Sequence, residues 1–251
     1  MTHYIAIIGA KGGCGKTTVV INLASALTQF GRTVIAVDYN IETPNLGMLL
    51  GFKNPSKTLL SAIKGKHRLH EAIFHHPSGL YVVPSAISHI SIDYRNVHYL
   101  LHDLHHKAEL VLLDTPTQCK DILHHVNECI IVTTADQPGV HAALKSIELA
   151  HEQHVSVLGI VINKFKETPH HLDIKHIQEV TKQKVIGIIH YDKELLEAIH
   201  HHYPVVYTHH EATATHDFKK IAGNLIGQPY IVKKTPWWHY VLERSGFKRP
   251  K

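Results

Sequence analysis

Residues 9–18, near the start of the chain, have the composition of a phosphate-binding loop. They read Gly-Ala-Lys-Gly-Gly-Cys-Gly-Lys-Thr-Thr and lie between an apolar stretch and a helical pattern. Glycines let the backbone curve until several N–H groups point at one anion, and the N-terminus of the following helix adds partial positive charge. Lys16 can reach the β- and γ-phosphates of a nucleotide, and the Thr17 hydroxyl can bind Mg²⁺. The loop therefore predicts a site for ATP and Mg²⁺. Its nucleotide-binding residues are Gly12, Gly13, Cys14, Gly15, Lys16, Thr17 and Thr18.

Apolar stretches alternate with helical patterns along the rest of the chain. Strands are expected at 4–8, 33–38, 80–83, 110–114, 129–133, 157–162 and 185–189, and helices at 17–30, 90–106, 140–152, 172–182, 194–200 and 213–226. The strand stretches are rich in Val and Ile and almost continuously apolar, which is typical of strands buried on both faces. The alternation predicts an α/β fold with a doubly wound, mostly parallel sheet flanked by helices.

The composition is that of a globular protein. The chain has 251 residues, of which 44% are hydrophobic and 19% charged, and three cysteines without a C-x-x-C pair. No apolar run reaches the roughly 18–20 residues that span a bilayer. Because strand-like residues follow Met1 almost at once, we expect no signal peptide. These features favour a reduced, cytoplasmic protein.

The excess positive charge lies in the last 22 residues. The net charge is +5, and residues 230–251, with six basic groups and one acidic group, account for all of it. We therefore divide the chain into a nucleotide-binding domain, residues 1–229, and a basic, aromatic tail, residues 230–251. A neutral body with a basic tail suggests an anionic partner for the tail, either lipid or nucleic acid.

The tail has the pattern of a short amphipathic helix. Thr235 is a good N-cap, Pro236 suits the first turn, and Gly246 suits the end. A period of 3.6 residues places four apolar side chains on one face: Trp237, Trp238, Val241 and Leu242. We expect this helix to lie in the interface of an anionic membrane. The alternative is that the two tryptophans pack back onto the domain.

Lys11 stands inside the loop, where an ordinary phosphate loop needs no charge. Residues 11–17, Lys-Gly-Gly-Cys-Gly-Lys-Thr, resemble the deviant Walker A motif of the MinD/ParA ATPases. In that family the extra lysine reaches across a dimer interface to the phosphates of the partner's ATP. The resemblance implies this role for Lys11, and implies a homodimer that ATP assembles and hydrolysis separates.

Other motifs resemble the same family, in the same order, over most of residues 1–226. Residues 38–40 with 44–47 resemble switch I, and residues 110–116 resemble Walker B running into switch II. The resemblance implies three roles. Asp114 would support Mg²⁺ through water. Asp38 and Asn40 would sense the γ-phosphate and the attacking water. Asn163 would lie at the adenine-contacting position.

Three positions depart from the family pattern. Asn40 stands where an aspartate positions the attacking water, and an amide cannot carry its negative charge. We therefore expect slow ATP hydrolysis. Thr117 and Gln118 replace the alanine and glycine of switch II, and His190-Tyr191 occupies a place where proline is common.

The sequence favours a MinD-like switch over two alternatives. Such a switch binds the cytoplasmic face of the membrane in its ATP state and positions a division, motility or polar structure, with an unidentified activating or cargo protein. The first alternative is a ParA-like ATPase that partitions DNA through nonspecific binding. The second is an ATP-bound scaffold that barely hydrolyses, which follows from Asn40.

Histidines and cysteines raise two further hypotheses, a metal site and an iron–sulfur cluster, and the sequence favours neither. The 26 histidines include His98, His102 and His106 at i+4 spacing, but no compact Cys/His constellation is present. We interpret them as surface residues. Cys119 follows switch II, where related reductases hold an iron–sulfur cluster, but the stretch 80–100 supplies no second cysteine.

Overall fold

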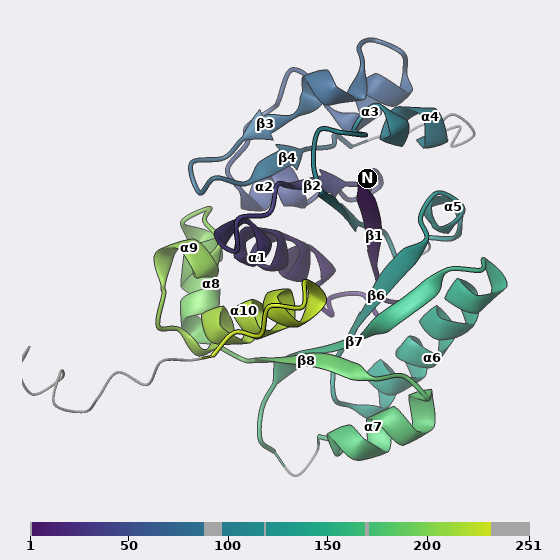
Figure 1. The fold of residues 1–251 in the computed structure, drawn as a ribbon, viewed down its shortest axis with the longest axis vertical. Helices are drawn as coiled ribbons and strands as arrows, with labels where there is room; N and C mark the ends of the chain where they lie inside the picture. The colour runs from purple at the N-terminus through teal and green to yellow at the C-terminus, as the bar shows by residue number, and fades with distance from the viewer. Residues whose placement is uncertain (1, 88–96, 118, 169–170, 232–251) are drawn as a thin grey trace, which may run out of the picture.

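An eight-stranded sheet forms the centre of the molecule (Figure 1). The computed structural model describes residues 2–87, 97–117, 119–168 and 171–231. The strand order is β3-β4-β2-β5-β1-β6-β7-β8, and every pair is parallel except β3–β4. The strands are β1 (His3–Ile8), β2 (Val34–Asp38), β3 (Phe74–His75), β4 (Tyr81–Val83), β5 (Leu110–Asp114), β6 (Glu128–Thr133), β7 (Ser156–Phe165) and β8 (Val185–His190). The doubly wound, mostly parallel α/β fold predicted from the sequence is confirmed.

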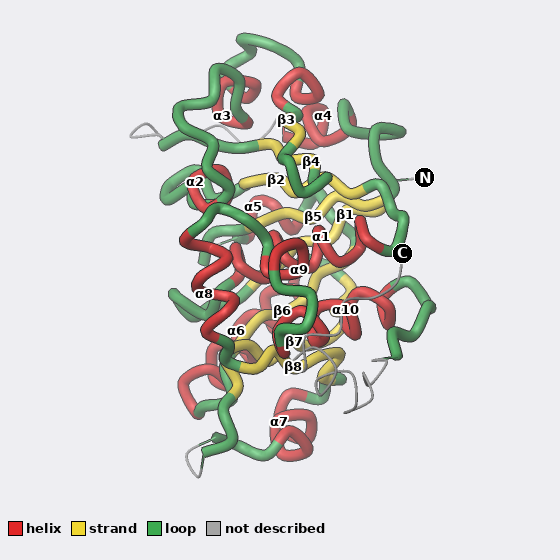
Figure 2. The backbone as a smooth tube through the Cα atoms, turned by 90° about the vertical axis from the view of Figure 1, so that its left-hand side faces the viewer, coloured by secondary structure: helices red, strands yellow, loops and turns green. Residues whose placement is uncertain are grey.

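Helices cover both faces of this sheet. They are α1 (Lys16–Gln29), α2 (Leu46–Leu49), α3 (Leu59–Ile63), α4 (Val97–His102), α5 (Lys120–Leu123), α6 (Gln137–Glu152), α7 (Ile174–Thr181), α8 (Lys193–His200), α9 (Val205–Thr208) and α10 (Thr213–Leu225), with a 3-10 turn, η1, at Leu69–Ala72. In Figure 1, α1, α8, α9 and α10 lie on one side of the sheet, and α5, α6 and α7 on the other. Figure 2 shows α3 and α4 at one end of the molecule and α7 at the opposite end.

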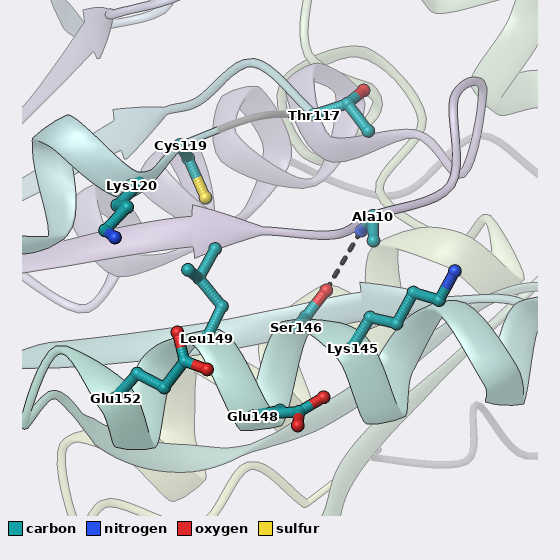
Figure 3. A pocket seen from close by; sticks show the side chains of 9 residues that line it. All are labelled: Ala10, Thr117, Cys119, Lys120, Lys145, Ser146, Glu148, Leu149 and Glu152. Carbon is teal, nitrogen blue, oxygen red and sulfur yellow. Dashed lines mark hydrogen bonds between the residues drawn. The ribbon is translucent and has the colours of Figure 1, made fainter.

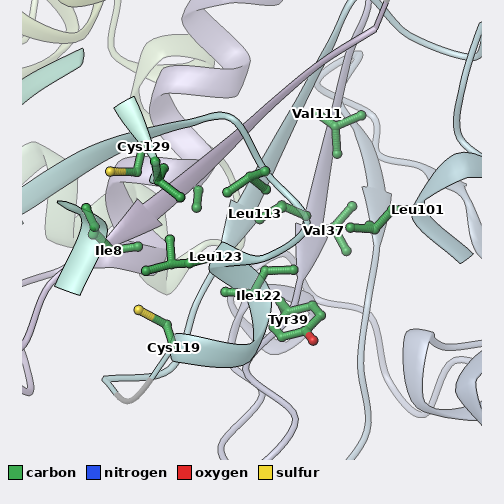
Figure 4. Packing of buried hydrophobic residues seen from close by; sticks show 14 of the residues in the cluster. Ile8, Val37, Tyr39, Leu101, Val111, Leu113, Cys119, Ile122, Leu123 and Cys129 are labelled. Atoms are coloured by element: carbon green, nitrogen blue, oxygen red, sulfur yellow. The ribbon is translucent and has the colours of Figure 1, made fainter. Parts of the chain in front are cut away.

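The apolar core has two layers, one on each face of the sheet. Alternate residues of β1 supply both layers: Ile5 and Ile7 pack with α1, α9 and α10, whereas Ala6 and Ile8 pack with α4, α5 and α6. Figure 4 shows part of the second layer around Leu113. The period of two explains why the strand sequences are almost continuously apolar, since both faces are buried.

All three cysteines are buried. Cys14 is 1% exposed and packs in the α1 layer. Cys119 and Cys129 lie in the opposite layer (Figure 4), where burial raises the pKa of their thiols to about 11 and about 12. Within the described ranges, no three or more His, Cys, Asp or Glu side chains are grouped so that they could hold a metal ion.

The helix predicted over residues 90–106 is wrong after His102. The helix α4 stops at His102, and the chain continues in tight turns with i→i+3 bonds. His106 then adopts a left-handed φ of 63°, and its N–H donates to Thr2 Oγ1 at 3.1 Å. A tertiary hydrogen bond to the start of β1 therefore replaces the expected last turn. Residues 90–96 lie outside the description.

Short elements and strand ends show smaller differences. The sequence patterns did not predict six short elements of two to five residues each: α2, α3, η1, β3, α5 and α9. The strand predicted to stop at residue 162 continues to Phe165. The tail helix lies outside the described residues. Every helix in the described ranges falls short of the length and apolarity needed to cross a bilayer.

Candidate nucleotide site

The phosphate loop follows the central strand of the sheet. The strand β1 lies between β5 and β6, and the chain goes from β1 to β2 on one side and later to β6 on the other. In open α/β sheets, ligands bind at the carboxyl ends of the strands where the order reverses in this way. The ends of β1, β2 and β5 meet here, and they bring residues 9–18, Asp38 and Asp114 to one edge.

The loop backbone has the conformation that an anion site needs. Gly13 and Gly15 adopt left-handed φ angles of 74° and 94°. Gly15 is the N-cap of α1, and no side chain caps that helix. Its first N–H groups and its partial positive charge are therefore open to an anion. A Cβ on Gly15 would collide with the side-chain amide of Asn163, so only glycine fits there.

A pocket of about 330 Å³ lies over this helix end. Residues of the phosphate loop and of both switch regions line this pocket. Its lining residues are Gly12, Gly13, Gly15, Lys16, Thr17, Thr18, Asn40, Thr43, Asn45, Leu49 and Thr117. The structure thus gathers six of the seven predicted loop residues with Asn40. The seventh, Cys14, is buried beneath the loop.

Asp114 has the surroundings expected of a group that binds a hydrated cation. The residue is fully buried, and neither carboxylate oxygen has a hydrogen-bond partner in the part of the chain that the structure describes. Burial raises the pKa of Asp114 to about 6, against the opposing effects of the Thr17 hydroxyl and the Lys16 charge. A buried carboxylate without partners is costly unless a cation or water satisfies it. Asp114 and Thr17 therefore fit Mg²⁺.

Asp38 ties switch I to the end of β2. Its Oδ2 accepts from Leu46 N at 3.0 Å, and its Oδ1 accepts from Asn40 N at 3.3 Å. Burial, and next the charge of Asp114, raise the pKa of Asp38 well above its usual range. The two carboxyls are register partners on β2 and β5. Asp38 is therefore placed to hold the switch backbone. It does not line this pocket, but it does line a second cavity of about 760 Å³.

Asn40 faces the pocket from switch I. Its Oδ1 accepts from the Thr43 hydroxyl at 3.1 Å and from the Thr43 N–H at 3.3 Å. These two hydrogen bonds close a short turn over residues 40–43. The Asn40 side-chain oxygen is thus already hydrogen-bonded to Thr43 in the same segment, and Asn40 still lines the pocket.

Lys11 lies at the rim of the loop, in an ion pair that the sequence did not predict. Its Nζ donates to Asp136 Oδ2 at 2.9 Å, to Asp136 Oδ1 at 3.0 Å and to Thr134 Oγ1 at 3.0 Å. Burial alone would raise the pKa of Asp136, but hydrogen bonds from Lys11 and neighbouring groups lower it overall. Asp136 is also the N-cap of α6, accepting from Gly139 N. In the sequence, Asp136 is marked only by its position two residues before Pro138, which is typical of a helix N-cap and does not indicate a partner for Lys11.

A serine on α6 also contacts the loop, and the sequence analysis missed it. Ala10 N donates to Ser146 Oγ at 3.0 Å (Figure 3). The contact lies beside a cleft of about 430 Å³ between α5 and α6, which Thr117 also lines. Ser146 falls on the buried face of an amphipathic helix, and sequence alone cannot distinguish it from a small core residue.

Asn163 lies behind the loop at the end of β7. Its Nδ2 donates to Cys14 O at 2.8 Å, and the side chain is 3% exposed. In this structure the amide therefore supports the loop directly. Its expected adenine contact stays a prediction.

Comparisons with known proteins find similar nucleotide-binding proteins. A family model described as the CobQ/CobB/MinD/ParA nucleotide binding domain matches residues 5–205. An uncharacterized ATP-binding protein of Methanocaldococcus jannaschii is 28% identical over 237 residues, covering 92% of this chain and 90% of that protein. The antiactivator FleN of Pseudomonas aeruginosa is 25% identical, with coverage of 96% and 92%. The septum site-determining protein MinD of Pyrococcus horikoshii, solved with Mg-ADP, superposes with a TM-score of 0.84 at 27% identity, covering 90% and 96%.

Proposed function

Because the chain belongs to the CobQ/CobB/MinD/ParA nucleotide-binding domain family, we propose that it is a MinD-like ATPase switch. In this proposal ATP and Mg²⁺ bind at the phosphate loop and join two copies face to face. The dimer binds the cytoplasmic face of the membrane through the tail. Its task is to position a division, motility or polar structure, with an activating or cargo protein.

The position of Lys11 carries the proposal. An ordinary loop lysine lies inside the site, as Lys16 does, with its Nζ on Gly9 O at 3.2 Å. Lys11 instead lies at the rim, one-third exposed and paired with Asp136, and it is not among the residues that line the nucleotide pocket. A cation at the rim can serve a nucleotide bound by a second copy of the chain.

When bound, Mg²⁺ would neutralise charge on the β- and γ-phosphates. Thr17 and Asp114 would hold it, while Lys16 and the loop amides would orient the phosphates. Asn40 would hold a water near the terminal phosphate without adding negative charge, so hydrolysis would be slow. A slow step would give a long-lived ATP dimer and leave room for an activating partner.

Charge and composition support lipid as the surface. The body, residues 1–229, carries no net charge, whereas the tail combines basic residues with Trp237 and Trp238. Tryptophan suits the headgroup region, and basic side chains suit anionic lipid. A single short helix binds weakly, so two tails in one dimer would increase binding through effective concentration.

Names of relatives suggest the class of task. One relative is named an antiactivator and another a septum site-determining protein. These names describe those proteins, and for this chain they support a positioning role without selecting the structure positioned.

Co-sedimentation with anionic liposomes, in ATP and in ADP, tests the proposal. Full-length protein would be compared with a truncation after Ile231. This end point keeps Tyr230, whose hydroxyl lies 3.0 Å from His216 Nδ1 and whose ring packs edge-on against Phe30. We expect lipid binding that requires ATP and is lost on truncation.

Two tail variants and a second ligand sharpen the result. The double variant Trp237→Ser, Trp238→Ser removes apolar area, and Lys248→Gln, Arg249→Gln removes charge; the membrane proposal expects both to weaken binding. Duplex DNA serves as the rival ligand. ATP-dependent DNA binding that survives truncation, without lipid binding, would contradict the proposal and favour DNA partitioning.

A further inference from the structure

Two consecutive side chains at the end of β7 reach the phosphate loop. Asn163 Nδ2 donates to Cys14 O at 2.8 Å, and Lys164 Nζ donates to Gly13 O at 2.8 Å. In a regular strand, successive side chains point to opposite faces of the sheet. Both contacts with one loop therefore require a local departure from strand geometry.

The departure is an irregularity in the pairing of β7 with β8. Ile162 pairs with Ile188, but Phe165 pairs with His190, so β7 has one more residue than β8 across this step. Lys164 has a left-handed φ of 56°, which is uncommon for a residue with a side chain. Asn163 Oδ1 accepts from Lys164 N at 2.9 Å and fixes the bend. Bulges of this kind redirect side chains next to functional sites.

The two contacts set the direction of the loop's N–H groups. In a trans peptide, the C=O of one residue and the N–H of the next point in opposite directions in one plane. Holding the carbonyls of Gly13 and Cys14 toward β7 therefore directs the N–H groups of Cys14 and Gly15 away from it. Those N–H groups belong to the part of the loop that would surround a phosphate.

We propose that Lys164 is a positioning residue of the nucleotide site, which with Asn163 holds the loop in its phosphate-binding conformation before the nucleotide arrives. The inference rests on the proposed function, since it assumes that ATP binds at this loop. The amine acts on the loop backbone and not on the reacting phosphate. Lys164 thus lowers the cost of ordering the loop, for ADP and ATP alike.

Lys164→Met tests this role, because methionine keeps the length of the side chain and removes the amine. Lys164 is exposed, and its bond adds little to the fold, so the melting temperature of the nucleotide-free protein should stay unchanged. Affinity for fluorescent ADP and for fluorescent ATP should fall by about tenfold, equally for both. Lys164→Arg should restore most of the affinity. The KM for ATP should rise while kcat stays near its original value.

Lys166→Met is the matched control. Lys166 is exposed on the same segment, but its Nζ lies 3.8 Å from the centre of the Tyr191 ring and does not contact the loop. Lys164→Gly distinguishes the effect of the amine from that of the backbone conformation, because glycine readily adopts the left-handed φ but lacks the amine. This variant should bind ADP and ATP as weakly as Lys164→Met.

Three outcomes would overturn the inference. The first is that Lys164→Met binds ADP as tightly as the unmodified chain does, provided that the unmodified chain binds ADP. The second is an equal loss in Lys166→Met. The third is a loss confined to ATP, which would place the amine on the terminal phosphate. If the unmodified chain bound neither nucleotide, the proposed function itself would fail and this inference with it.

Discussion

Asp136 holds the ammonium group of Lys11 with both carboxylate oxygens, at 2.9 and 3.0 Å. The same carboxylate caps α6, so the rim of the phosphate loop is joined to the start of that helix. Under the proposed function Lys11 must leave this pair to reach a nucleotide in a second subunit. The pair then favours the monomer.

Asp136→Asn should therefore strengthen ATP-dependent dimerisation. Asparagine can still cap α6, but it loses the charge that holds Lys11. Both side chains are about one-third exposed, so each pair is worth about 0.5–1 kcal/mol. A symmetric dimer breaks two such pairs, so we expect a decrease of about fivefold to thirtyfold in the dimer dissociation constant. Sedimentation velocity in ATP measures this change. Weaker dimerisation in Asp136→Asn would show that the carboxylate acts within the dimer instead.

Lys11→Ala should abolish ATP-dependent dimerisation and leave ADP affinity within about twofold, since Lys11 does not line the nucleotide pocket. Lys64→Ala, at an exposed lysine that ends α3, is the control and should behave as the unmodified chain. A large loss of ADP affinity in Lys11→Ala would mean that the lysine serves its own subunit.

Asp114→Asn should stabilise the nucleotide-free protein at neutral pH and remove its response to Mg²⁺. The pKa of Asp114 is about 6 in the fold against 3.8 as the ordinary value, so the folded state retains the proton more strongly. Stability from this group is therefore present below about pH 4 and is lost as the pH rises toward 6. The loss amounts to about 3 kcal/mol at most. Asparagine carries no charge and avoids it.

Urea denaturation at pH 5 and pH 7.5, without nucleotide, measures this difference. The gap between the two pH values should shrink in Asp114→Asn. Thermal shifts with ADP and Mg²⁺ should be lost in the same variant, and binding by the unmodified chain should weaken below pH 6 as the carboxyl takes up a proton. Full retention of the Mg²⁺-dependent shift would rule out Asp114 as a support for the metal.

Sequence reasoning could predict the parts of the site that depend on one short segment. The loop, its helix and the strand before it are contiguous, so periodicity and glycine spacing define them. Contacts such as Lys11–Asp136 and Lys164–Gly13 join residues more than a hundred positions apart. They depend on which strands become neighbours, and on a bulge in β7 that no residue pattern marks. The predicted end of α4 was wrong for the same reason. The backbone N–H of His106 donates to Thr2 Oγ1, and this bond between distant residues replaces the last helical turn.

Gly12→Ala and Gly15→Ala should separate folding from ligand binding. A Cβ on Gly12 meets nothing within 4 Å, whereas one on Gly15 meets Asn163 in a left-handed backbone. We expect no loss of stability for Gly12→Ala and a loss of about 2 kcal/mol for Gly15→Ala. Both should bind ADP poorly, because both residues line the pocket. Chemical denaturation and calorimetry measure the two effects, and equal stabilities would contradict the assigned loop geometry.

Asn40→Asp should accelerate ATP hydrolysis. The structure places the Asn40 side chain in the pocket lining, held by Thr43 through its Oδ1. An aspartate can keep that contact and add the negative charge that orients and polarises a water. We expect kcat to rise by roughly tenfold in steady-state phosphate release. Asn45→Asp is the control, because Asn45 lines the same pocket but uses its amide on Thr43 O. An unchanged rate in Asn40→Asp, or an equal rise in Asn45→Asp, would mean that the residue at position 40 does not limit turnover.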